Sequence, residues 1–247
     1  MQRLRGTGGG TGGKIPLMEL LVDYCRNELQ NWKSSELFWM FTATLAVTIC
    51  TLLSGGDNAL GLVSALTGIA YTLLAGKGKS SCYVFGAVNT LLYGYIAYRS
   101  RVFGDMLLNW GYYFPMQFVG LYMWRQHRSA QTGEVLKRKL TLRQEIFLLA
   151  GIAVCWLSFG FLLKHFGAFS PFLDSATTVL SVAAMLLGVL RCFEQWIAWT
   201  IVNALSVWLW IQVYLQQGNS LATLLMWFVF LICGLVFARQ WLAEVKK

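Results

Sequence analysis

The chain has 247 residues, of which 57% are hydrophobic and only 13% are charged, and its mean hydropathy is +0.55. Soluble domains carry roughly a quarter of charged residues, so this composition argues against a soluble globular protein. The net charge of +9 and the many aromatic residues point instead to a membrane protein with basic loops.

The first 36 residues are polar or amphipathic and precede the first apolar segment. A Gly/Thr stretch over 6–13 is expected to form a flexible tail. Over 15–32, apolar residues recur at helical spacing, which indicates an amphipathic helix on the membrane surface or one packed on the bundle. No small-residue cleavage pattern is found here, so no removed signal peptide is expected.

Eight apolar segments follow, and each is about as long as a transmembrane helix must be. None has Asp, Glu, Lys or Arg in its interior, and turn-forming residues separate several of them. Because no long alternating pattern occurs, the sequence predicts an all-α integral membrane protein rather than a β-barrel. The predicted segments are 37–53, 59–75, 82–98, 106–124, 146–163, 175–190, 196–215 and 221–238.

Lysines and arginines are distributed unevenly between the two ends of these segments. With the N-terminus inside and eight crossings, 17 of the 20 lysines and arginines fall on the inner side. The positive-inside rule then places both termini in the cytoplasm. The longest connection, 125–145, is basic, and it is expected to be a solvated loop that fixes topology, the alternative being a docking site for a partner.

The sequence partly matches itself at an offset of 114 residues. Asn89 falls on Asn203, and Gly104, Gly120 and Arg125 fall on Gly218, Gly234 and Arg239. Segments 2–4 thus correspond to segments 6–8, which predicts two parallel three-helix repeats with a substrate site between them. The predicted division is 1–36 cytoplasmic tail and amphipathic helix, 37–54 extra transmembrane helix, 59–126 first repeat, 127–165 basic loop and linker helix, 174–240 second repeat, and 241–247 cytoplasmic tail.

Amides inside the predicted spans are the candidate ligand-binding groups. A buried amide without a partner costs on the order of 1–3 kcal/mol, so each needs a helix neighbour or a ligand. For Asn89 alone, hydrogen bonding between helices is as good an interpretation as ligand contact. Aromatic neighbours favour ligand contact for Gln117 and Asn203.

Two aromatic–amide stripes emerge from helical spacing. Trp196, Trp199 and Asn203 share one face with Ser206, whereas Trp208 and Trp210 are expected to be belt or packing residues. Facing stripes would form a slot for a flat ring, including a cationic one. For Trp196 the alternative is an interfacial aromatic belt. The second stripe consists of Asn109, Tyr113 and Gln117, with Pro115 expected to loosen the backbone between them.

No sequence pattern indicates enzymatic chemistry. The chain lacks Walker, HExxH and GxSxG motifs, so an ATPase or a membrane hydrolase is not expected. Its six cysteines form no CxxC pair and are expected to be small buried side chains, and two histidines offer little for a metal site. We therefore expect a chain that is not an enzyme and that needs no cofactor, metal or nucleic acid.

Two segments resemble the signature of the PnuC family of nicotinamide riboside transporters. One is DMLLNWGYYFPMQFVGLYMW over 105–124, and the other is the pattern ExWxxWxxxNxxS over 194–206. The resemblance covers about residues 59–240 and leaves out the N-terminal tail. It implies a SWEET-like 3+1+3 fold preceded by one extra helix, and facilitated diffusion of nicotinamide riboside across the bacterial inner membrane. It also implies that a cytoplasmic kinase traps the nucleoside by phosphorylation.

The expected function is therefore a uniporter of nicotinamide riboside, with Asn89, Asn109, Tyr113, Gln117, Trp196, Trp199 and Asn203 as substrate-binding residues. Spans without acidic residues fit transport that is not coupled to an ion. Transport of thiamine or riboflavin, a substrate-binding subunit with a separate ATPase, and a membrane scaffold or sensor are the alternatives. A homo-oligomer, for instance a trimer, is left open.

Overall fold

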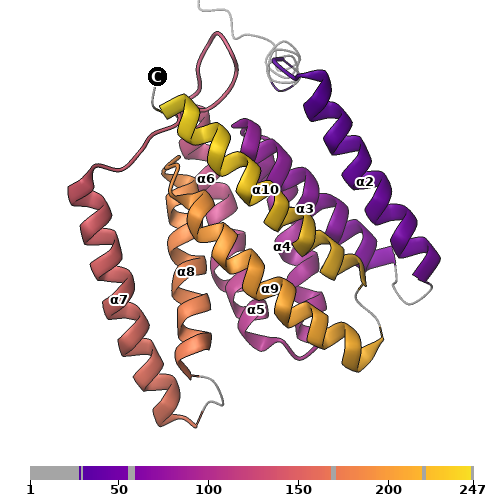
Figure 1. Cartoon of the computed structure of the whole chain (residues 1–247), viewed down its shortest axis with the longest axis vertical. Coiled ribbons are helices and arrows are strands. Elements are labelled where there is room, and N and C mark those ends of the chain that lie inside the picture. The colour runs from indigo at the N-terminus through magenta and orange to yellow at the C-terminus, as the bar shows by residue number, and fades with distance from the viewer. Residues whose placement is uncertain (1–27, 29, 55–58, 168–170, 219–220, 246–247) are drawn as a thin grey trace, which may run out of the picture.

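The computed structural model describes residues 28, 30–54, 59–167, 171–218 and 221–245. Within these ranges there are two isolated β-bridges and no strand, so the protein is all-α as expected. The tail over 6–13 and almost all of the helix expected over 15–32 lie outside the described residues. The elements, shown in Figure 1, are α2 (Ser34–Ser54), α3 (Ala59–Lys77), α4 (Cys82–Arg99), α5 (Phe103–Leu107), the π-helix η1 (Leu108–Tyr113), α6 (Phe114–Gln126), α7 (Leu142–His165), α8 (Pro171–Val189), α9 (Gln195–Gln217) and α10 (Leu221–Val245).

Every predicted apolar segment is helical, the fourth as the continuous run α5–η1–α6. By length and hydropathy, five described helices can cross a membrane, namely α3, α7, α8, α9 and α10, and the apolar part of α2 is shorter. The helix α4 and the run α5–η1–α6 are less apolar because they carry the amides and tyrosines discussed below.

Two helix ends differ from the expected boundaries for local reasons. The helix α8 begins at Pro171, four residues before the predicted segment, because proline fits the first turn of a helix. The helix α10 continues to Val245, beyond the predicted end at 238. This extension is stabilised by Trp241, which is fully buried and donates its indole N–H to the carbonyl of Gly76 at 2.7 Å.

Six helices form a closed ring around the centre of the bundle. Around it, α3 packs on α4, α4 on α6, α6 on α8, α8 on α9, α9 on α10, and α10 on α3. The helix α2 packs outside the ring against α3 and α10, and α7 lies at the edge of the bundle against α8 (Figure 1). The ring encloses the site described below.

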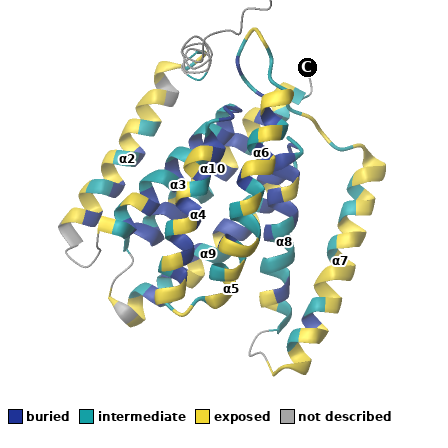
Figure 2. Cartoon of the chain, turned by 180° about the vertical axis from the view of Figure 1, so that it is seen from behind, coloured by how far each residue is buried: buried dark blue, intermediate teal, exposed yellow. Residues whose placement is uncertain are grey.

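Burial follows this arrangement. Figure 2 shows buried residues on the faces of the ring helices that point inward and exposed residues on α2 and α7. Many exposed side chains are large and apolar, including Phe38, Phe147, Trp208 and Leu215. Such an apolar exterior is what a lipid environment requires, because lipid tails solvate these side chains and water does not.

A connecting loop, residues 127–141, is hydrogen-bonded to two interhelical turns at one end of the bundle. The backbone N–H of Val135 donates to the carbonyl of Gly78 at 2.8 Å, in the turn between α3 and α4. On the other side, Phe193 donates to the carbonyl of Arg138 at 2.8 Å, in the turn between α8 and α9. The loop is therefore hydrogen-bonded to the α3–α4 turn and to the α8–α9 turn.

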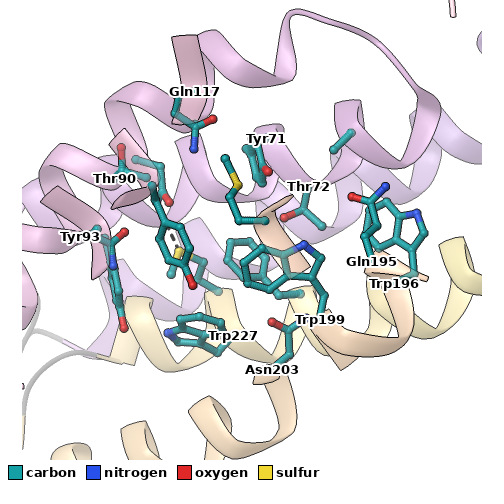
Figure 3. Close-up of a pocket in the computed structure, with 18 residues that line it drawn as sticks. Tyr71, Thr72, Thr90, Tyr93, Gln117, Gln195, Trp196, Trp199, Asn203 and Trp227 are labelled. Carbon is teal, nitrogen blue, oxygen red and sulfur yellow. Dashed lines mark hydrogen bonds between the residues drawn. The ribbon is translucent and has the colours of Figure 1, made fainter. Parts of the chain in front are cut away.

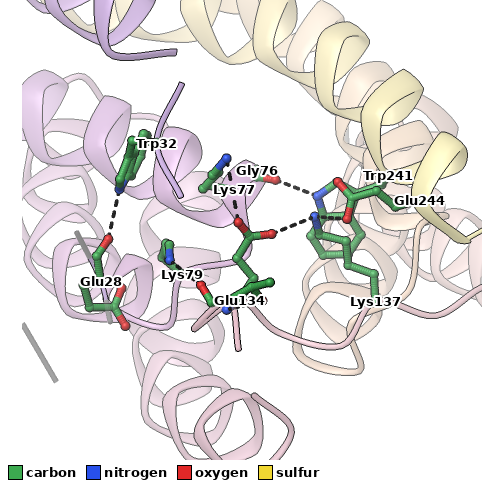
Figure 4. A network of polar contacts seen from close by, with 10 residues as sticks. Glu28, Trp32, Gly76, Lys77, Lys79, Glu134, Lys137, Trp241 and Glu244 are labelled. Atoms are coloured by element: carbon green, nitrogen blue, oxygen red, sulfur yellow. Dashed lines mark hydrogen bonds and ion pairs between the residues drawn. The ribbon is translucent and has the colours of Figure 1, made fainter. Parts of the chain in front are cut away.

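Charged side chains strengthen this end (Figure 4). The carboxylate of Glu134 lies 3.7 Å from the ammonium groups of both Lys77 and Lys137, and Lys137 also pairs with Glu244 of α10 at 2.5 Å. The ammonium of Lys79 donates to the carbonyl of Thr132 at 3.1 Å. Burial lowers the pKa of Lys79, and this effect is opposed by the carboxylates of Glu134 and Glu28.

Several glycines in the six-helix ring leave space for an aromatic side chain of a neighbouring helix. One of them, Gly120, allows a test of this packing. A Cβ at Gly120 of α6 would overlap the ring of Tyr83 on α4, whereas a Cβ at Gly151 of α7 would meet nothing within 4 Å. We expect Gly120→Ala to destabilise the protein by roughly 1–3 kcal/mol, the usual cost of overpacking. Gly151→Ala is the matched control and should leave stability unchanged or slightly raised, because alanine favours helix. Thermal unfolding of both variants in detergent measures the difference, and equal melting temperatures would contradict this packing.

Candidate functional site

A cavity of about 80 Å³ lies between α3, α4, the run η1–α6, α8, α9 and α10. All seven residues singled out from the sequence line it, although they come from three separate segments of the chain. They are Asn89, Asn109, Tyr113, Gln117, Trp196, Trp199 and Asn203. The two predicted stripes therefore face one common cavity, shown in Figure 3.

The π-helix presents one of these stripes. Its last turn is wound so that the N–H of Phe114 donates to the carbonyl of Asn109, five residues earlier. Pro115 follows at once and has no N–H to continue an α-helical ladder, which accounts for the irregular winding where the sequence predicted a loosened backbone. As a result Asn109, Tyr113 and Gln117 all point at the cavity.

An aromatic pair forms one wall of the cavity. The rings of Tyr113 and Trp199 lie 5.9 Å apart at an angle of 57°, so the two stripes meet directly. Trp227 and Phe230 of α10 line the same space and are in contact with each other, with centroids 5.3 Å apart. The sequence patterns did not single out these α10 residues, although Trp227 lies 114 positions after Tyr113.

The amides of the cavity differ in what they already bind. Asn89 donates to the backbone carbonyl of Ser64 at 2.8 Å and lies 3.7 Å from the sulfur of Met226, so it joins α4 to α3 and α10. Asn109 donates to the carbonyl of Asp105 at 2.8 Å. Asn203 is buried at the cavity wall. The side-chain nitrogen of Asn89 thus takes part in helix packing, one of the two interpretations that the sequence left open, while the residue also lines the cavity.

Other polar atoms at the cavity have no hydrogen-bond partner among the described residues. These buried atoms include Oε1 of Gln117, Nε2 of Gln195 and Nε1 of Trp196. Gly86 faces the Gln117 amide so closely that a Cβ would overlap Oε1, which leaves this amide room inside the ring. Buried polar atoms of this kind are costly unless a ligand satisfies them, so they mark the cavity as a binding site.

Gln195 and Trp196, at the start of α9, extend the site toward the connecting loop. Gln195 was not expected from the sequence, yet it lies four residues before Trp199 and the same helical spacing would have found it. Trp196 is 4% exposed and packs against Phe237 and Trp241, with centroids at 5.1 and 5.8 Å, so it does not belong to an interfacial belt. Trp208 is 65% exposed, as a belt residue would be.

The opposite end of the cavity is formed by Tyr93 of α4. Its hydroxyl donates to the carboxylate of Asp105, and it accepts the indole N–H of the fully buried Trp210 at 2.8 Å. Tyr93 also packs on Trp227, with ring centroids 5.8 Å apart. The sequence placed Asp105 at a helix end, and the structure adds that its carboxylate contacts a residue of the cavity.

The described residues of the lining are all uncharged. Among the described residues around the cavity there is no Asp, Glu, Lys, Arg or His. Across the described ranges, no cluster of three or more His, Cys, Asp or Glu residues could hold a metal ion. The chemistry available at the site is therefore hydrogen bonding by amides and hydroxyls and stacking on aromatic rings.

Comparison with known proteins identifies the family. Residues 58–243 match the model of the family described as "Nicotinamide mononucleotide transporter". The nicotinamide riboside transporter PnuC of Neisseria mucosa is 35% identical over 221 residues, covering 87% of this chain and 84% of that protein. The PnuC transporter of Haemophilus influenzae is 32% identical, covering 89% of this chain and 94% of that protein.

A solved structure agrees with the fold as well. The crystal structure of the vitamin B3 transporter PnuC superposes with a TM-score of 0.82 at 34% identity, covering 90% of this chain and 97% of that one. The relatives of this chain named above are transport proteins and not enzymes. The chain, with its apolar helices and its uncharged aromatic–amide cavity, belongs to the nicotinamide mononucleotide transporter family of membrane transport proteins, which includes the PnuC transporters.

Proposed function

We propose that this chain is a uniporter that carries nicotinamide riboside across the bacterial inner membrane by facilitated diffusion. The observation that carries this proposal is the uncharged cavity in which an aromatic pair, Tyr113 and Trp199, stands beside buried amides. Nicotinamide riboside has a flat cationic ring, a carboxamide and ribose hydroxyls. Aromatic faces attract the ring, and amides such as Gln117 and Asn203 bind the carboxamide and the sugar.

The relatives support the same substrate, because the PnuC proteins of Neisseria mucosa and Haemophilus influenzae are named nicotinamide riboside transporters. Thiamine and riboflavin are the alternatives within transport. A thermal-shift assay on the purified chain distinguishes these substrates. It compares the stabilisation by nicotinamide riboside, nicotinamide, thiamine and riboflavin. Stabilisation by thiamine or riboflavin but not by the riboside would overturn the proposed substrate.

We further propose a topology of eight spans with a 3+1+3 parallel repeat, in which α2 is the extra helix and α7 is the linker. Packing supports the repeat: α3 contacts α10, and the corresponding helices α8 and α6 contact each other. Residues 114 positions apart also occupy comparable places. Asn89 and Asn203 line the cavity, as do Tyr113 and Trp227.

The charge distribution supports an orientation with both termini in the cytoplasm. Figure 1 shows the C-terminal end of α10, the connecting loop and the start of α2 at the same end of the bundle. Lys77, Lys79 and Lys137 gather there, whereas Arg99 and Lys164 lie near helix ends on the opposite side. In this orientation the cytoplasmic kinase that we propose for trapping meets the nucleoside as it leaves.

A first prediction concerns the orientation of α9. Trp199→Ala should weaken nicotinamide riboside binding by roughly 1–2 kcal/mol, about five- to thirty-fold, because the ring that faces Tyr113 is lost. Trp208→Ala removes the same side chain from the same helix at an exposed position and should leave affinity unchanged. Titration calorimetry measures both, and equal affinities of two folded variants would mean that Trp199 does not contact the ligand.

A second prediction concerns the phosphorylated substrate, because the family description mentions a mononucleotide. No lysine or arginine is found among the described lining residues, and burying a phosphate without a cation is costly. The chain should therefore transport nicotinamide riboside and exclude nicotinamide mononucleotide. Uptake of both compounds into proteoliposomes tests this, and equal rates would contradict it.

A third prediction is that transport needs neither ATP nor an ion gradient, since the described residues that line the cavity include no acid to carry a coupled proton or sodium ion. Proteoliposomes with imposed proton or sodium gradients should reach the same final internal concentration as those without. Accumulation above equilibrium in the absence of a kinase would rule out uniport. A requirement for a separate ATPase would instead support a substrate-binding subunit.

A further inference from the structure

A carboxylate lies directly behind the uncharged lining of the cavity. Asp105 of α5 accepts the hydroxyl hydrogen of Tyr93, whose side chain lines the cavity and is only 3% exposed. The oxygen of the same hydroxyl accepts the indole N–H of Trp210. An indole N–H can only donate, so the Tyr93 oxygen is the acceptor in its bond with Trp210. The hydroxyl hydrogen of Tyr93 is then the donor in its bond with Asp105.

A second cavity residue is tied to the same position. The side-chain nitrogen of Asn109 donates to the backbone carbonyl of Asp105 at 2.8 Å. Asp105 is thus connected to α4 through Tyr93 and to the π-helix through Asn109. The first contact holds the carboxylate of Asp105 against Tyr93 at the end of the cavity opposite the connecting loop, and the second bonds its backbone to a residue of the lining.

Four other acidic residues of the described chain lie away from the cavity lining. Glu134 and Glu244 pair with lysines at the connecting loop. Glu194 accepts the backbone N–H of Leu140 at 3.0 Å. Asp174 is exposed in the first turn of α8. Within the described ranges, Asp105 is the acid whose carboxylate is hydrogen-bonded to a side chain of the cavity.

A cation in this cavity needs a counter-charge, because removing it from water is costly and aromatic rings compensate only in part. A carboxylate one hydrogen bond behind the wall acts through a medium of low dielectric constant, in which its attraction reaches farther than in water. Hydrogen bonding of Tyr93 to a carboxylate also makes its ring richer in electrons, which strengthens its attraction for a cation.

We infer that Asp105 is a positioning residue that supplies the negative charge for a cationic ring, acting through Tyr93 without touching the ligand. This inference rests on the proposed function. It adds a source of specificity, because the site then prefers a pyridinium nucleoside over an uncharged nucleoside of nearly the same shape. The reduced form of nicotinamide riboside, a neutral 1,4-dihydropyridine with the same carboxamide and ribose, provides that comparison.

The test is the ratio of the affinities for these two compounds, measured by titration calorimetry on the full chain. Asp105→Asn removes the charge and keeps an oxygen that accepts from Tyr93. It should weaken binding of nicotinamide riboside about tenfold, or ~1.4 kcal/mol, and leave the reduced form within about twofold. Asp174→Asn removes an acid that does not contact the cavity, and it should change neither affinity.

Tyr93→Phe provides a second variant that keeps the ring, and it decides the question if Asp105→Asn does not fold. It should also lower the preference for the cation, because the link to Asp105 is cut. An unchanged ratio in these variants, or equal weakening of both compounds, would overturn the inference and leave Asp105 with a structural role. If the unmodified chain binds neither compound, the proposed function itself fails, an outcome distinct from a folded variant with an unchanged ratio.

Discussion

A buried amide in an apolar bundle must find a hydrogen-bond partner, and this requirement organises the centre of the molecule. Asn89 meets it by donating to the carbonyl of Ser64, which joins α4 to α3. Gln117 and Gln195 leave atoms without partners among the described residues, and these atoms face the cavity. The same residue type therefore holds helices together at one position and is available to a ligand at another. The role depends on whether a backbone carbonyl of a neighbouring helix lies within hydrogen-bond distance of the amide, as that of Ser64 does for Asn89.

The cavity is held in shape by contacts between α10 and α3 and between α6 and α8. Trp241 of α10 donates to the carbonyl of Gly76 on α3, and Trp124 of α6 donates to that of Gly188 on α8 at 2.9 Å. The two indoles contact each other, with centroids 6.2 Å apart. Beyond them, the connecting loop bonds to both turns. Hydrogen bonds and aromatic contacts therefore join all of these elements at this end of the bundle.

Helical spacing was sufficient to identify the six cavity residues of the two stripes, because each stripe lies on a single helical face. Asn89 was found instead as an amide inside a predicted span. Helical spacing was not sufficient to find Tyr93, since its importance depends on Asp105 and Trp210, which approach from other segments. Periodicity likewise identified the apolar segments but not the end of α10, where packing of Trp241 extends the helix. The periodicity of one helix does not predict which side chains of neighbouring helices it will contact.

The π-helix η1 has a consequence for the symmetry of the site. A π-helical turn rises less along its axis per residue than an α-helical one, so the run α5–η1–α6 is not geometrically equivalent to the regular helix α10. Asn109 and Tyr113 both line the cavity, whereas 114 positions later Trp227 lines it and Thr223 is buried outside its lining. Two fully equivalent halves would present identical walls, which suit a ligand with identical ends. A nucleoside has a base at one end and a sugar at the other, and a local change of helix type in one half is enough to make the two walls unlike.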